Sequence, residues 1–546
     1  MADVEVGGRE AERVMWDVIV VGTGMGGGMA GQRLAKLGRN VLFVEKGNST
    51  LPGTPGTIRD EMPELAEPGA GRSQRTYYDA LARGGRTIDE VTDISGRFPK
   101  RFIPFIGSGT GGSSALYGMV CERFFAADYT PRQNFTDPGE STVPEAWPVT
   151  YDQMSPWYAE AEKLLGVRGQ PDPLRPEAAH VQLPPPPPFS AENQPLVNYL
   201  SGRGLHPYHL PMACDYTDDC ATCQTYLCSK SCKNDAARAG VLPAVTEHGA
   251  RLLANCRVVR LEADRTHVQQ VICQRRNDML ALKAKVVVLA AGALATPVLL
   301  LNSRSGQWPR GLANGSDWVG RNLMRHLLDP IEIWPVRGHK TTAANKEIGL
   351  NDFYFQDGQK YGTVQSFGAI PPMEWLTNRP GLQGNALRAI TPAVRQVYQR
   401  MFAGGIVLAA MTEDLPYLDN RVLPSDRPIV DGRQRLRMHY RLHPSEIARR
   451  ESFLSLLNEA LEPFRKLPLG SGKDNASLGH VCGTCRFGTD PKTSVLNSEN
   501  RAHEVENLYV VDSSFFPSSA GLNPSLTVAA NALRAAEHIN EAQFCG

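Results

Sequence analysis

Three glycines near the N-terminus have the spacing that a nucleotide-binding turn requires. Gly22, Gly24 and Gly27 form a G-x-G-x-x-G pattern directly after the apolar run 18–21. The first glycine allows a sharp turn, the second lets the backbone approach a pyrophosphate, and the third lets the next helix pack closely on its strand. Glu45 ends the following apolar run, where a carboxylate can accept hydrogen bonds from ribose hydroxyls. The pattern predicts an adenine dinucleotide site but does not distinguish FAD from NAD.

A second group of reactive side chains is a cluster of cysteines. Five of the 11 cysteines lie within one short segment: Cys214, Cys220, Cys223, Cys228 and Cys232. Thiolates this close in sequence can bind an iron–sulfur cluster, whereas zinc knuckles usually stand further apart. Disulfides joining Cys220 or Cys223 to Cys228 or Cys232 require oxidation or export. A cluster, disulfides and free thiols all stay open.

The whole chain narrows the class of protein. With 546 residues it can form two or more substructures. The 58 basic and 57 acidic residues leave no net charge that would favour nucleic acid as a partner. No apolar run is long enough to span a bilayer, and the first 15 residues lack the features of a signal peptide. We therefore expect a cytoplasmic protein that binds a small neutral or mixed-charge ligand.

Several further elements are expected to surround the nucleotide. Glycines crowd the stretch 107–118, which favours close approach of its backbone to a ligand. Buried strands are expected at 283–289, before Gly292, and at 508–511, before Asp512. Together with the run 18–21, they predict that both ends of the chain meet at one nucleotide.

Two other regions have a distinct pattern. Ser155 as N-cap and Pro156 as first residue predict a helix that ends near Gly166. Between residues 328 and 477, short strands alternate with turns, and helical pieces are expected near Arg395 and Glu446. This region predicts a separate antiparallel sheet with helices, which would form the wall of a substrate site.

Taken together, four blocks resemble the glucose-methanol-choline (GMC) family of flavin oxidoreductases. In the family's order they are residues 22–45, residues 111–119, residues 287–297 with 319–324, and a tail containing 480–484, 512 and 521–524. The resemblance implies FAD and an α/β fold, in which a Rossmann-like FAD-binding domain carries a discontinuous antiparallel-sheet substrate domain. It implies FAD-binding parts at 14–160, 211–325 (with the cysteine-rich segment) and 479–546, a linker and substrate-domain entry at 161–210, and a substrate domain at 326–478.

The same resemblance implies roles for individual residues. His480 corresponds to the family's active-site histidine, Asn523 to its partner, and Asp512 to the acid at the ribityl and phosphate end of the flavin. A neutral imidazole can take the proton of an alcohol near pH 7, and an amide can hold the substrate oxygen. Without the family, His480 would be taken as structural, and Asn523 can simply cap its helix. The full set of expected cofactor-binding residues is Gly22, Gly24, Gly27, Glu45, Gly111, Gly112, Ser113, Tyr117, Val258, Gly292 and Asp512.

Some residues depart from the family pattern or have no place in it. Tyr117 stands where many members have asparagine. No histidine follows Gly112 at the position that carries covalent flavin in some members, so we expect non-covalent FAD. The remaining histidines are expected to be surface or packing residues, among them His206, His209, His326 and His503.

The expected reaction is FAD-dependent oxidation of a CH–OH group, in a sugar or amino-sugar alcohol, by hydride transfer to flavin N5. The cysteine-rich segment is similar to that of flavin enzymes that oxidise a primary hydroxyl in aminoglycoside antibiotic assembly. It is also similar to the iron–sulfur segment of bacterial FAD-dependent glucose dehydrogenases, with Cys223, Cys228 and Cys232 as candidate ligands. One alternative is therefore a sugar dehydrogenase subunit that passes electrons through a cluster to a partner. Another is a flavoprotein lyase with no net oxidation. The electron acceptor, oxygen or another, is left open.

Overall fold

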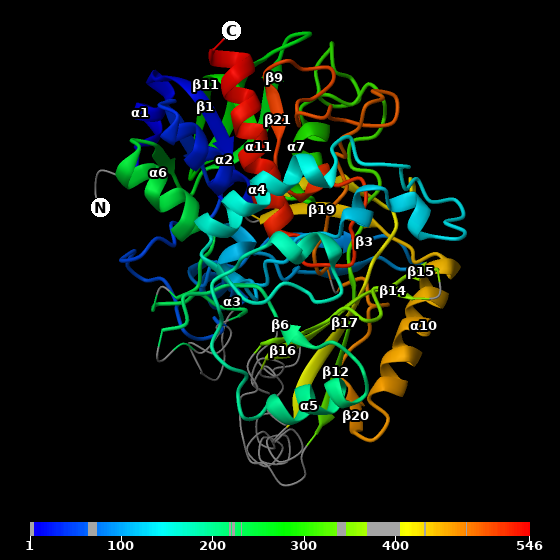
Figure 1. The fold of residues 1–546 in the computed structure, drawn as a ribbon. Coiled ribbons are helices and arrows are strands. Elements are labelled where there is room, and N and C mark those ends of the chain that lie inside the picture. Colours follow the sequence, from blue (N-terminus) through cyan, green and yellow to red (C-terminus); the bar gives the residue numbers. More distant parts are fainter. Residues whose placement is uncertain are drawn as a thin grey trace.

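The computed structural model of the protein describes residues 5–63, 74–217, 220, 224–230, 232–335, 346–356, 358–368, 405–430, 433–476 and 478–545. Two large sheets organise the chain, and Figure 1 shows them in opposite halves of the molecule. The half that contains α2 and α11 is built on a mainly parallel sheet, and the half that contains α10 is built on an antiparallel one. The fold is thus the predicted combination of a Rossmann-like part and an antiparallel-sheet part.

The first sheet brings the two ends of the sequence together. Its order is β8 (Arg251–Leu253), β2 (Val41–Val44), β1 (Met15–Val21), β11 (Asp278–Leu289), β10 (Val268–Arg275) and β9 (Arg257–Ala263), with β21 (Leu508–Val510) paired to β11. Strands β8, β2, β1, β11 and β21 are parallel, whereas β10 runs antiparallel to both of its neighbours. Because β11 pairs with β1 and with β21, the N-terminal and C-terminal strands share one sheet, as expected from their apolar runs.

Helices cover this sheet. α2 (Met25–Lys36) packs against α11 (Ser525–Phe544), and α11 packs against α4 (Tyr151–Leu164). The predicted start of α4 was wrong. Its N-cap is Thr150, whose hydroxyl accepts from the Gln153 backbone N–H while the Gln153 side chain accepts from the Thr150 N–H. This capping box satisfies two free donors and outweighs the signal from Ser155 and Pro156, which lies inside the helix.

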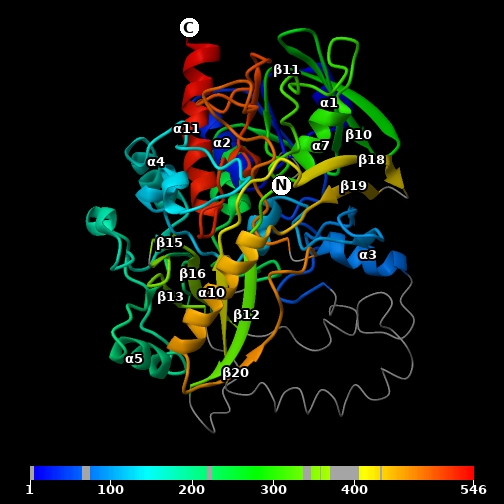
Figure 2. The same ribbon diagram turned by 90° about the vertical axis from the view of Figure 1, so that its right-hand side faces the viewer.

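The second sheet is antiparallel throughout. Its order is β20 (Arg465–Pro468), β12 (Leu327–Trp334), β17 (Ile406–Thr412), β16 (Gly362–Gly368), β13 (Ile348–Leu350) and β6 (Tyr208–His209). α10 (Pro444–Ala460) packs against β17 and runs alongside this sheet in Figure 2. The separate antiparallel sheet and the helix near Glu446 are confirmed; the helix expected near Arg395 lies outside the described residues.

Smaller elements connect the two halves. A four-stranded sheet, β18 (Arg421–Val430), β19 (Arg433–His439), β3 (Glu90–Asp93) and β4 (Lys100–Phe102), joins the region 326–478 to the N-terminal region. The remaining strands form the pairs β5 (Val167–Arg168) with β7 (Met212–Ala213) and β14 (Phe355–Gln356) with β15 (Gln359–Lys360). The remaining helices include α1 (Gly8–Arg13), α3 (Gln74–Arg83), α5 (Gln194–Gly202), α6 (Leu242–Glu247) and α7 (Ala295–Asn302), together with a π-helical turn, η5 (Ala237–Val241). Among the helices of the described ranges, none is long and apolar enough to cross a membrane.

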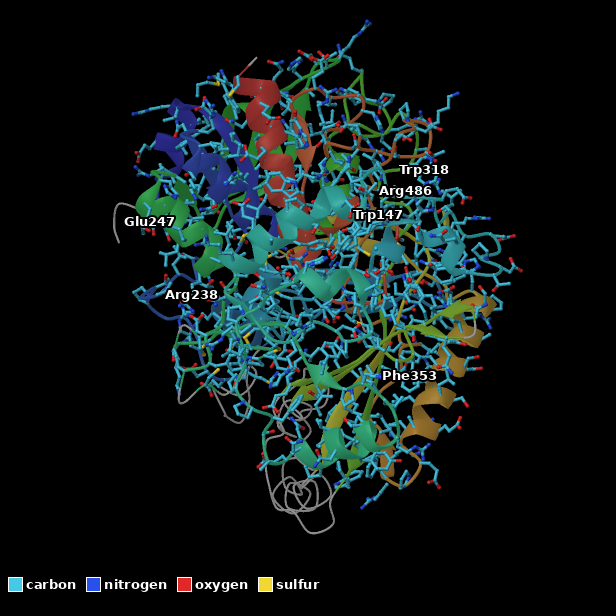
Figure 3. All side chains as sticks on the ribbon, in the orientation of Figure 1. Trp147, Arg238, Glu247, Trp318, Phe353 and Arg486 are labelled. Carbon is cyan, nitrogen blue, oxygen red and sulfur yellow. The ribbon has the colours of Figure 1, made fainter. Side chains whose placement is uncertain are left out.

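An aromatic cluster supports the C-terminal loop. Trp147 packs against Phe124, Phe515 and Phe516, and its indole N–H donates to Ser518 Oγ at 2.7 Å. Figure 3 shows Trp147 in the upper half of the molecule, in the region of α4 and α11. The loop that follows Ser518 leads to Asn523, so rigid aromatic packing underlies one wall of the candidate site.

Candidate active site

The glycine turn after β1 depends on the absence of side chains. Gly22 has φ +98°, and an added Cβ would come within 2.4 Å of the Ala290 carbonyl oxygen. A Cβ on Gly27 would come within 2.1 Å of the Gly22 carbonyl oxygen, which fits its predicted role in close helix–strand packing. Gly24 differs, because a Cβ there would meet nothing within 4 Å. Gly22 and Gly27 are therefore required by the protein's own packing, whereas Gly24 leaves space open.

One glycine of this turn was not singled out in the sequence. A Cβ on Gly26 would lie 2.1 Å from the carbonyl oxygen of Val511, the residue just after β21. Gly26 therefore lets the N-terminal helix α2 approach the C-terminal strand directly. The run of glycines from 26 to 28 was the available signal, but its partner is nearly 500 residues away in the sequence.

Glu45 lies at the end of β2 and is held by the protein. Thr23 donates from its backbone N–H at 3.2 Å and from its hydroxyl at 2.7 Å to Glu45 Oε2, and the Gly47 N–H donates to Oε1 at 2.9 Å. A carboxylate offers about four acceptor positions, so roughly one is left for a ligand. The side chain is in place to bind one hydroxyl rather than a pair.

Asp512 follows β21 and is also fixed by donors. Gly292 N–H and the Thr296 hydroxyl donate to Oδ2 at 2.9 and 2.5 Å, and the Ser514 N–H donates to Oδ1 at 2.9 Å. Burial raises the pKa of Asp512 above its ordinary value, although these hydrogen bonds oppose the rise. Asp512 thus links the strand β21 to the turn after β11, the two elements that were expected to meet here.

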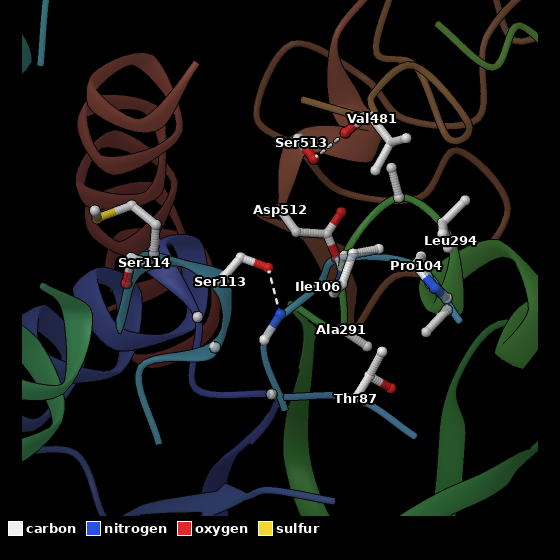
Figure 4. A pocket seen from close by; sticks show the side chains of 18 of the residues that line it. Thr87, Pro104, Ile106, Ser113, Ser114, Ala291, Leu294, Val481, Asp512 and Ser513 are labelled. Atoms are coloured by element: carbon white, nitrogen blue, oxygen red, sulfur yellow. Dashed lines mark hydrogen bonds between the residues drawn. The ribbon is translucent and has the colours of Figure 1, made fainter. Parts of the chain in front are cut away.

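The glycine-rich stretch 107–118 forms the facing wall. Gly111 and Gly112 have φ +90° and +53°, and a Cβ on Gly112 would lie 2.9 Å from the Gly24 Cα. Ser113 Oγ accepts from the Gly107 N–H at 3.1 Å, as Figure 4 shows. The Tyr117 hydroxyl donates to the Asn234 carbonyl, and burial raises the pKa of Tyr117 well above its ordinary value. The Tyr117 hydroxyl is therefore neutral, and its one proton is used in a hydrogen bond within the protein.

These walls enclose a cavity of about 730 Å³, which is within the usual range for a ligand pocket. Figure 4 shows Asp512, Ser113 and Ala291 around the same space. Of the residues expected at the site, those that line the cavity are Gly22, Gly24, Glu45, Gly112, Ser113, Tyr117, Val258, Gly292, His480, Asp512 and Asn523. Gly27 and Gly111 do not line it. The fold therefore brings the glycine turn near the N-terminus and His480 near the C-terminus to one cavity.

His480 and Asn523 lie at the same end of this cavity. His480 Nε2 is 3.5 Å from Asn523 Nδ2, and the Gln365 amide donates to Asn523 Oδ1 at 3.0 Å. Asn523 stands two residues before α11, so the free N–H groups of that helix face the same region. Burial, with a contribution from His326 and Lys346, lowers the pKa of His480 well below its ordinary value. The imidazole is therefore neutral near pH 7.

His326, which was expected to be a packing residue, contacts His480 directly. The two Nδ1 atoms are 2.8 Å apart, and His326 is completely buried. Hydrogen bonds between Met324 and Cys482 and between the His326 N–H and the Gly479 carbonyl hold the two segments side by side. The available signal was a histidine within the apolar stretch after residues 319–324, which the sequence does not distinguish from a satisfied core histidine.

Polar side chains continue along the wall near His480. Lys346, Gln365 and Gln224 line the cavity, and burial lowers the pKa of Lys346 to about 8. The Lys346 ammonium is 5.1 Å from the centre of the Phe367 ring. This end of the cavity can therefore bind hydroxyl groups and offers one positive charge near neutral pH.

The described cysteines of the cysteine-rich segment do not line the cavity, although Gln224 and Thr225 of the same segment do. Cys214 and Cys220 have sulfurs 3.5 Å apart, and so do Cys228 and Cys232. Cys223 lies outside the described residues. Within the described ranges, no group of three or more histidine, cysteine or acidic side chains is arranged to hold a metal ion.

Comparison with known proteins decides the family. Residues 19–328 match the N-terminal part of GMC oxidoreductase, and residues 416–532 match its C-terminal part. The chain belongs to the GMC oxidoreductase family. It is an FAD-dependent oxidoreductase that acts on CH–OH groups, as the sequence predicts.

Two relatives span nearly the whole chain. The protein is 27% identical to paromamine 6'-oxidase of Streptomyces fradiae, over 97% of this chain and 92% of the relative. It is 29% identical to 6'''-hydroxyparomomycin C oxidase of Streptomyces lividus, with the same coverage. The fold is similar to that of pyridoxine 4-oxidase from Mesorbium loti, with a TM-score of 0.62 at 20% identity over 96% of this chain and 99% of that one.

Members of this family bind FAD, and the cavity of this GMC oxidoreductase fits such a cofactor. Gly24 and Gly292 border it, and an added Cβ at either would meet no protein atom within 4 Å. Open space beside these glycines fits a ligand that the backbone approaches closely. Glu45 and Asp512, both fixed by protein donors, supply acceptors to the same cavity.

Proposed function

We propose that this GMC oxidoreductase oxidises the CH–OH group of a sugar-like or aminocyclitol-linked alcohol to an aldehyde or ketone, with non-covalently bound FAD as the hydride acceptor. One observation carries the proposal: a single cavity is lined by the glycine turn with Glu45 and by the His480–Asn523 pair. The cofactor and the base would then meet in the same space.

The residues that would hold FAD are those of the glycine turn, Glu45 and Asp512. Glu45 has about one acceptor position left for a ribose hydroxyl, and the first N–H groups of α2 follow Gly24. FAD, when bound, supplies the acceptor for the two electrons of the alcohol's C–H bond. Among the described residues that line the cavity, His480 is the one histidine, which favours non-covalent attachment.

His480 would act as the base. A hydride leaves the alcohol carbon while the hydroxyl proton passes to His480 Nε2, so the product is a carbonyl and the imidazole becomes cationic. Asn523 Nδ2 points to the same atom and would hold the alcohol oxygen between the two side chains. The 3.5 Å separation is long for a hydrogen bond, so little is lost when a substrate oxygen takes its place.

The polar wall supports a hydroxylated substrate. Lys346, Gln365 and Gln224 would bind substrate hydroxyls, and Gln365 already orients Asn523. The two Streptomyces relatives are oxidases of aminoglycoside substrates by name, so we extend the proposal to a role in antibiotic biosynthesis.

The test is anaerobic bleaching of the flavin. Purified protein, reconstituted with FAD, is mixed without air with paromamine, D-glucose, D-fructose, gluconate or 2-methyl-1,2-propanediol. Loss of flavin absorbance with at least one hydroxylated sugar is expected. A protein that binds no FAD, or a flavin that no alcohol bleaches, would contradict the proposal. Acid precipitation should release the flavin into the supernatant if attachment is non-covalent.

Two predictions stand apart from this proposal. An iron–sulfur cluster at Cys223, Cys228 and Cys232 stays a prediction, tested by iron and acid-labile sulfide analysis of purified protein. Oxygen as electron acceptor also stays a prediction. It is tested by the rate at which the reduced flavin regains its absorbance when air is admitted, compared with a dye as acceptor.

A further inference from the structure

We propose that His326 is a positioning residue that fixes the tautomer of His480: its Nδ1 accepts the Nδ1–H of His480, which leaves His480 Nε2 unprotonated toward the cavity. This inference rests on the proposed role of His480 as the base. His326 itself does not line the cavity. Its influence would pass entirely through the contact between the two Nδ1 atoms.

Two backbone carbonyl groups determine which nitrogen donates in each of these hydrogen bonds. His326 Nε2 lies 2.9 Å from the Ala520 carbonyl oxygen and 3.2 Å from that of Ser519. A carbonyl oxygen only accepts, so His326 Nε2 carries a proton. In a neutral imidazole the other nitrogen is then an acceptor, so His326 Nδ1 accepts a hydrogen bond from the Nδ1–H of His480, 2.8 Å away.

The environment of His326 keeps it neutral. The side chain is completely buried, and burial lowers its pKa to about 4. Lys360 opposes a positive charge there, while Asp128 favours one more weakly. Lys360 is itself paired with Asp128 and Glu413, each at 2.5 Å, so this neighbouring charge is largely compensated.

The amide side of His480 gives the same direction independently. Gln365 Nε2 donates to Asn523 Oδ1, which turns the Asn523 NH₂ group toward His480 Nε2. A donor at that position matches an unprotonated Nε2. Four hydrogen bonds therefore join five groups in one ordered chain: Gln365 donates to Asn523, Asn523 to His480, His480 to His326, and His326 to Ala520.

The backbone on both sides of this chain is held in a conformation that costs energy. His480 has φ +59° and Ala520 has φ +54°, in the left-handed region that residues other than glycine rarely adopt. Ser519 is anchored because its hydroxyl donates to the Asp414 carbonyl at 2.8 Å. The surrounding structure thus holds both residues in strained conformations, in which the Ala520 carbonyl points to His326 and the His480 ring faces the cavity.

The chemistry requires no additional reactant. When His480 Nε2 takes the alcohol proton, its Nδ1–H stays in place and donates to His326 as the ring becomes cationic. His326 remains neutral and donates through Nε2 to the Ala520 carbonyl. It holds the base without competing for the proton, whereas a carboxylate at that position would raise the basicity of His480.

Two substitutions separate the two nitrogens of His326. His326→Asn places an amide oxygen near Nδ1 and keeps an acceptor for His480. His326→Gln reaches the Nε2 position and can donate to Ala520, but it leaves the His480 Nδ1–H without an acceptor. His209→Gln is the matched control, because His209 is a buried histidine (3% exposed) that does not line the cavity. FAD content and thermal unfolding show whether each variant folds.

The decisive measurement is solid-state ¹⁵N NMR of protein labelled in the histidine rings. The difference spectrum against His480→Asn isolates the His480 signals. We expect a protonated Nδ1 and an unprotonated Nε2 in wild type, in His326→Asn and in the His209→Gln control, and a protonated Nε2 in His326→Gln. A protonated Nε2 in wild type, or the same His480 tautomer in both His326 variants, would overturn the proposal.

Flavin reduction gives a second readout. With the alcohol from the bleaching panel that acts fastest, His326→Gln should reduce the flavin about 10²-fold more slowly than wild type, and His326→Asn within about tenfold of it. The apparent KM should change little in either. Equal rates in the two variants would contradict the inference. If no alcohol bleaches wild-type flavin, the proposed function fails while the NMR result still decides the tautomer.

Discussion

The glycine turn after β1 and the histidine pair at the other end of the cavity are built in opposite ways. The turn is made by the consecutive residues 22–27 and requires the absence of side chains, because a Cβ on Gly22 or Gly27 would strike backbone atoms. The histidine pair is made by three distant segments, 324–326, 479–482 and 519–523, and depends on which atom donates to which. A methyl group added to a glycine of the turn should therefore impair protein stability or FAD binding. At the histidine pair, a side chain of similar shape that reverses one hydrogen bond should slow flavin reduction.

The largest effect is expected at His480. His480→Ala removes the proposed base, so the rate of anaerobic flavin reduction should fall by about 10²- to 10⁴-fold. FAD content should stay near that of wild type, because the glycine turn is untouched. Stopped-flow absorbance measures the rate, with His206→Gln as a control at an exposed histidine outside the cavity lining. An unchanged rate in His480→Ala would show that His480 is not the base and that the histidine pair takes no part in the oxidation.

A pH titration tests whether the histidine pair is held neutral. The pKa of His326 is lowered to about 4 in the folded protein, against an ordinary value of 6.5. Between these values the unfolded chain binds a proton that the folded chain does not, so stability should fall as the pH falls from 6.5 toward 4. For a completely buried group the contribution is roughly 3 kcal/mol. Urea unfolding at several pH values measures it.

The variant His326→Asn supplies the comparison for this titration. It should lose less stability than wild type over the same range, because one of the two depressed histidines is gone. Above pH 6.5, where both states are neutral, the two curves should run parallel. Parallel curves over the whole range would mean that His326 has the same pKa in the folded protein as in the unfolded chain.

The contrast between the local glycine turn and the histidine pair built from distant segments also explains which features could be predicted from the sequence. The turn, the strands β1, β11 and β21, and the antiparallel sheet were predictable because each leaves a local pattern of apolar and glycine residues. Gly26 was missed as a contact because its partner, Val511, is distant in the chain. The role of Thr150 was missed because its capping box with Gln153 competes with an equally regular local signal from Ser155 and Pro156.

The histidine pair could be anticipated only in part. His480 and Asn523 were found through the family's tail motif, but nothing local marks His326 as different from other buried histidines. Its position depends on hydrogen bonds between residues 324–326 and 479–482, which form only when the chain has folded. Hydrogen-bond direction is a property of the folded network, and no spacing in the sequence encodes it.

Smaller effects are expected from alanine substitutions in the turn, which distinguish glycines needed for protein packing from those that leave space for the cofactor. Gly26→Ala forces a methyl group against the Val511 carbonyl oxygen, and such overpacking should destabilise the apoprotein by about 1–3 kcal/mol. Gly24→Ala meets no protein atom within 4 Å, so it should leave apoprotein stability unchanged and weaken FAD binding instead. Thermal unfolding of apoprotein and FAD titration separate the two. Gly202→Ala, at an exposed helix end with open space, is the neutral control.

The smallest effect is expected at Glu45. Here the glycine turn resembles the histidine pair, because it too depends on which atoms donate and which accept. Glu45→Gln replaces one carboxylate oxygen by an NH₂ group, which cannot accept from the Thr23 or Gly47 N–H. The single amide oxygen then serves the protein donors and no acceptor is left for a ribose hydroxyl, a loss of about 1–2 kcal/mol, so the Kd for FAD should rise by roughly tenfold. Thr23→Val removes only the hydroxyl donor and frees an acceptor position on Glu45. It should lower apoprotein stability without weakening FAD binding comparably. If both variants bind FAD as tightly as wild type, Glu45 only braces the loop, and the turn recognises its cofactor through backbone groups alone.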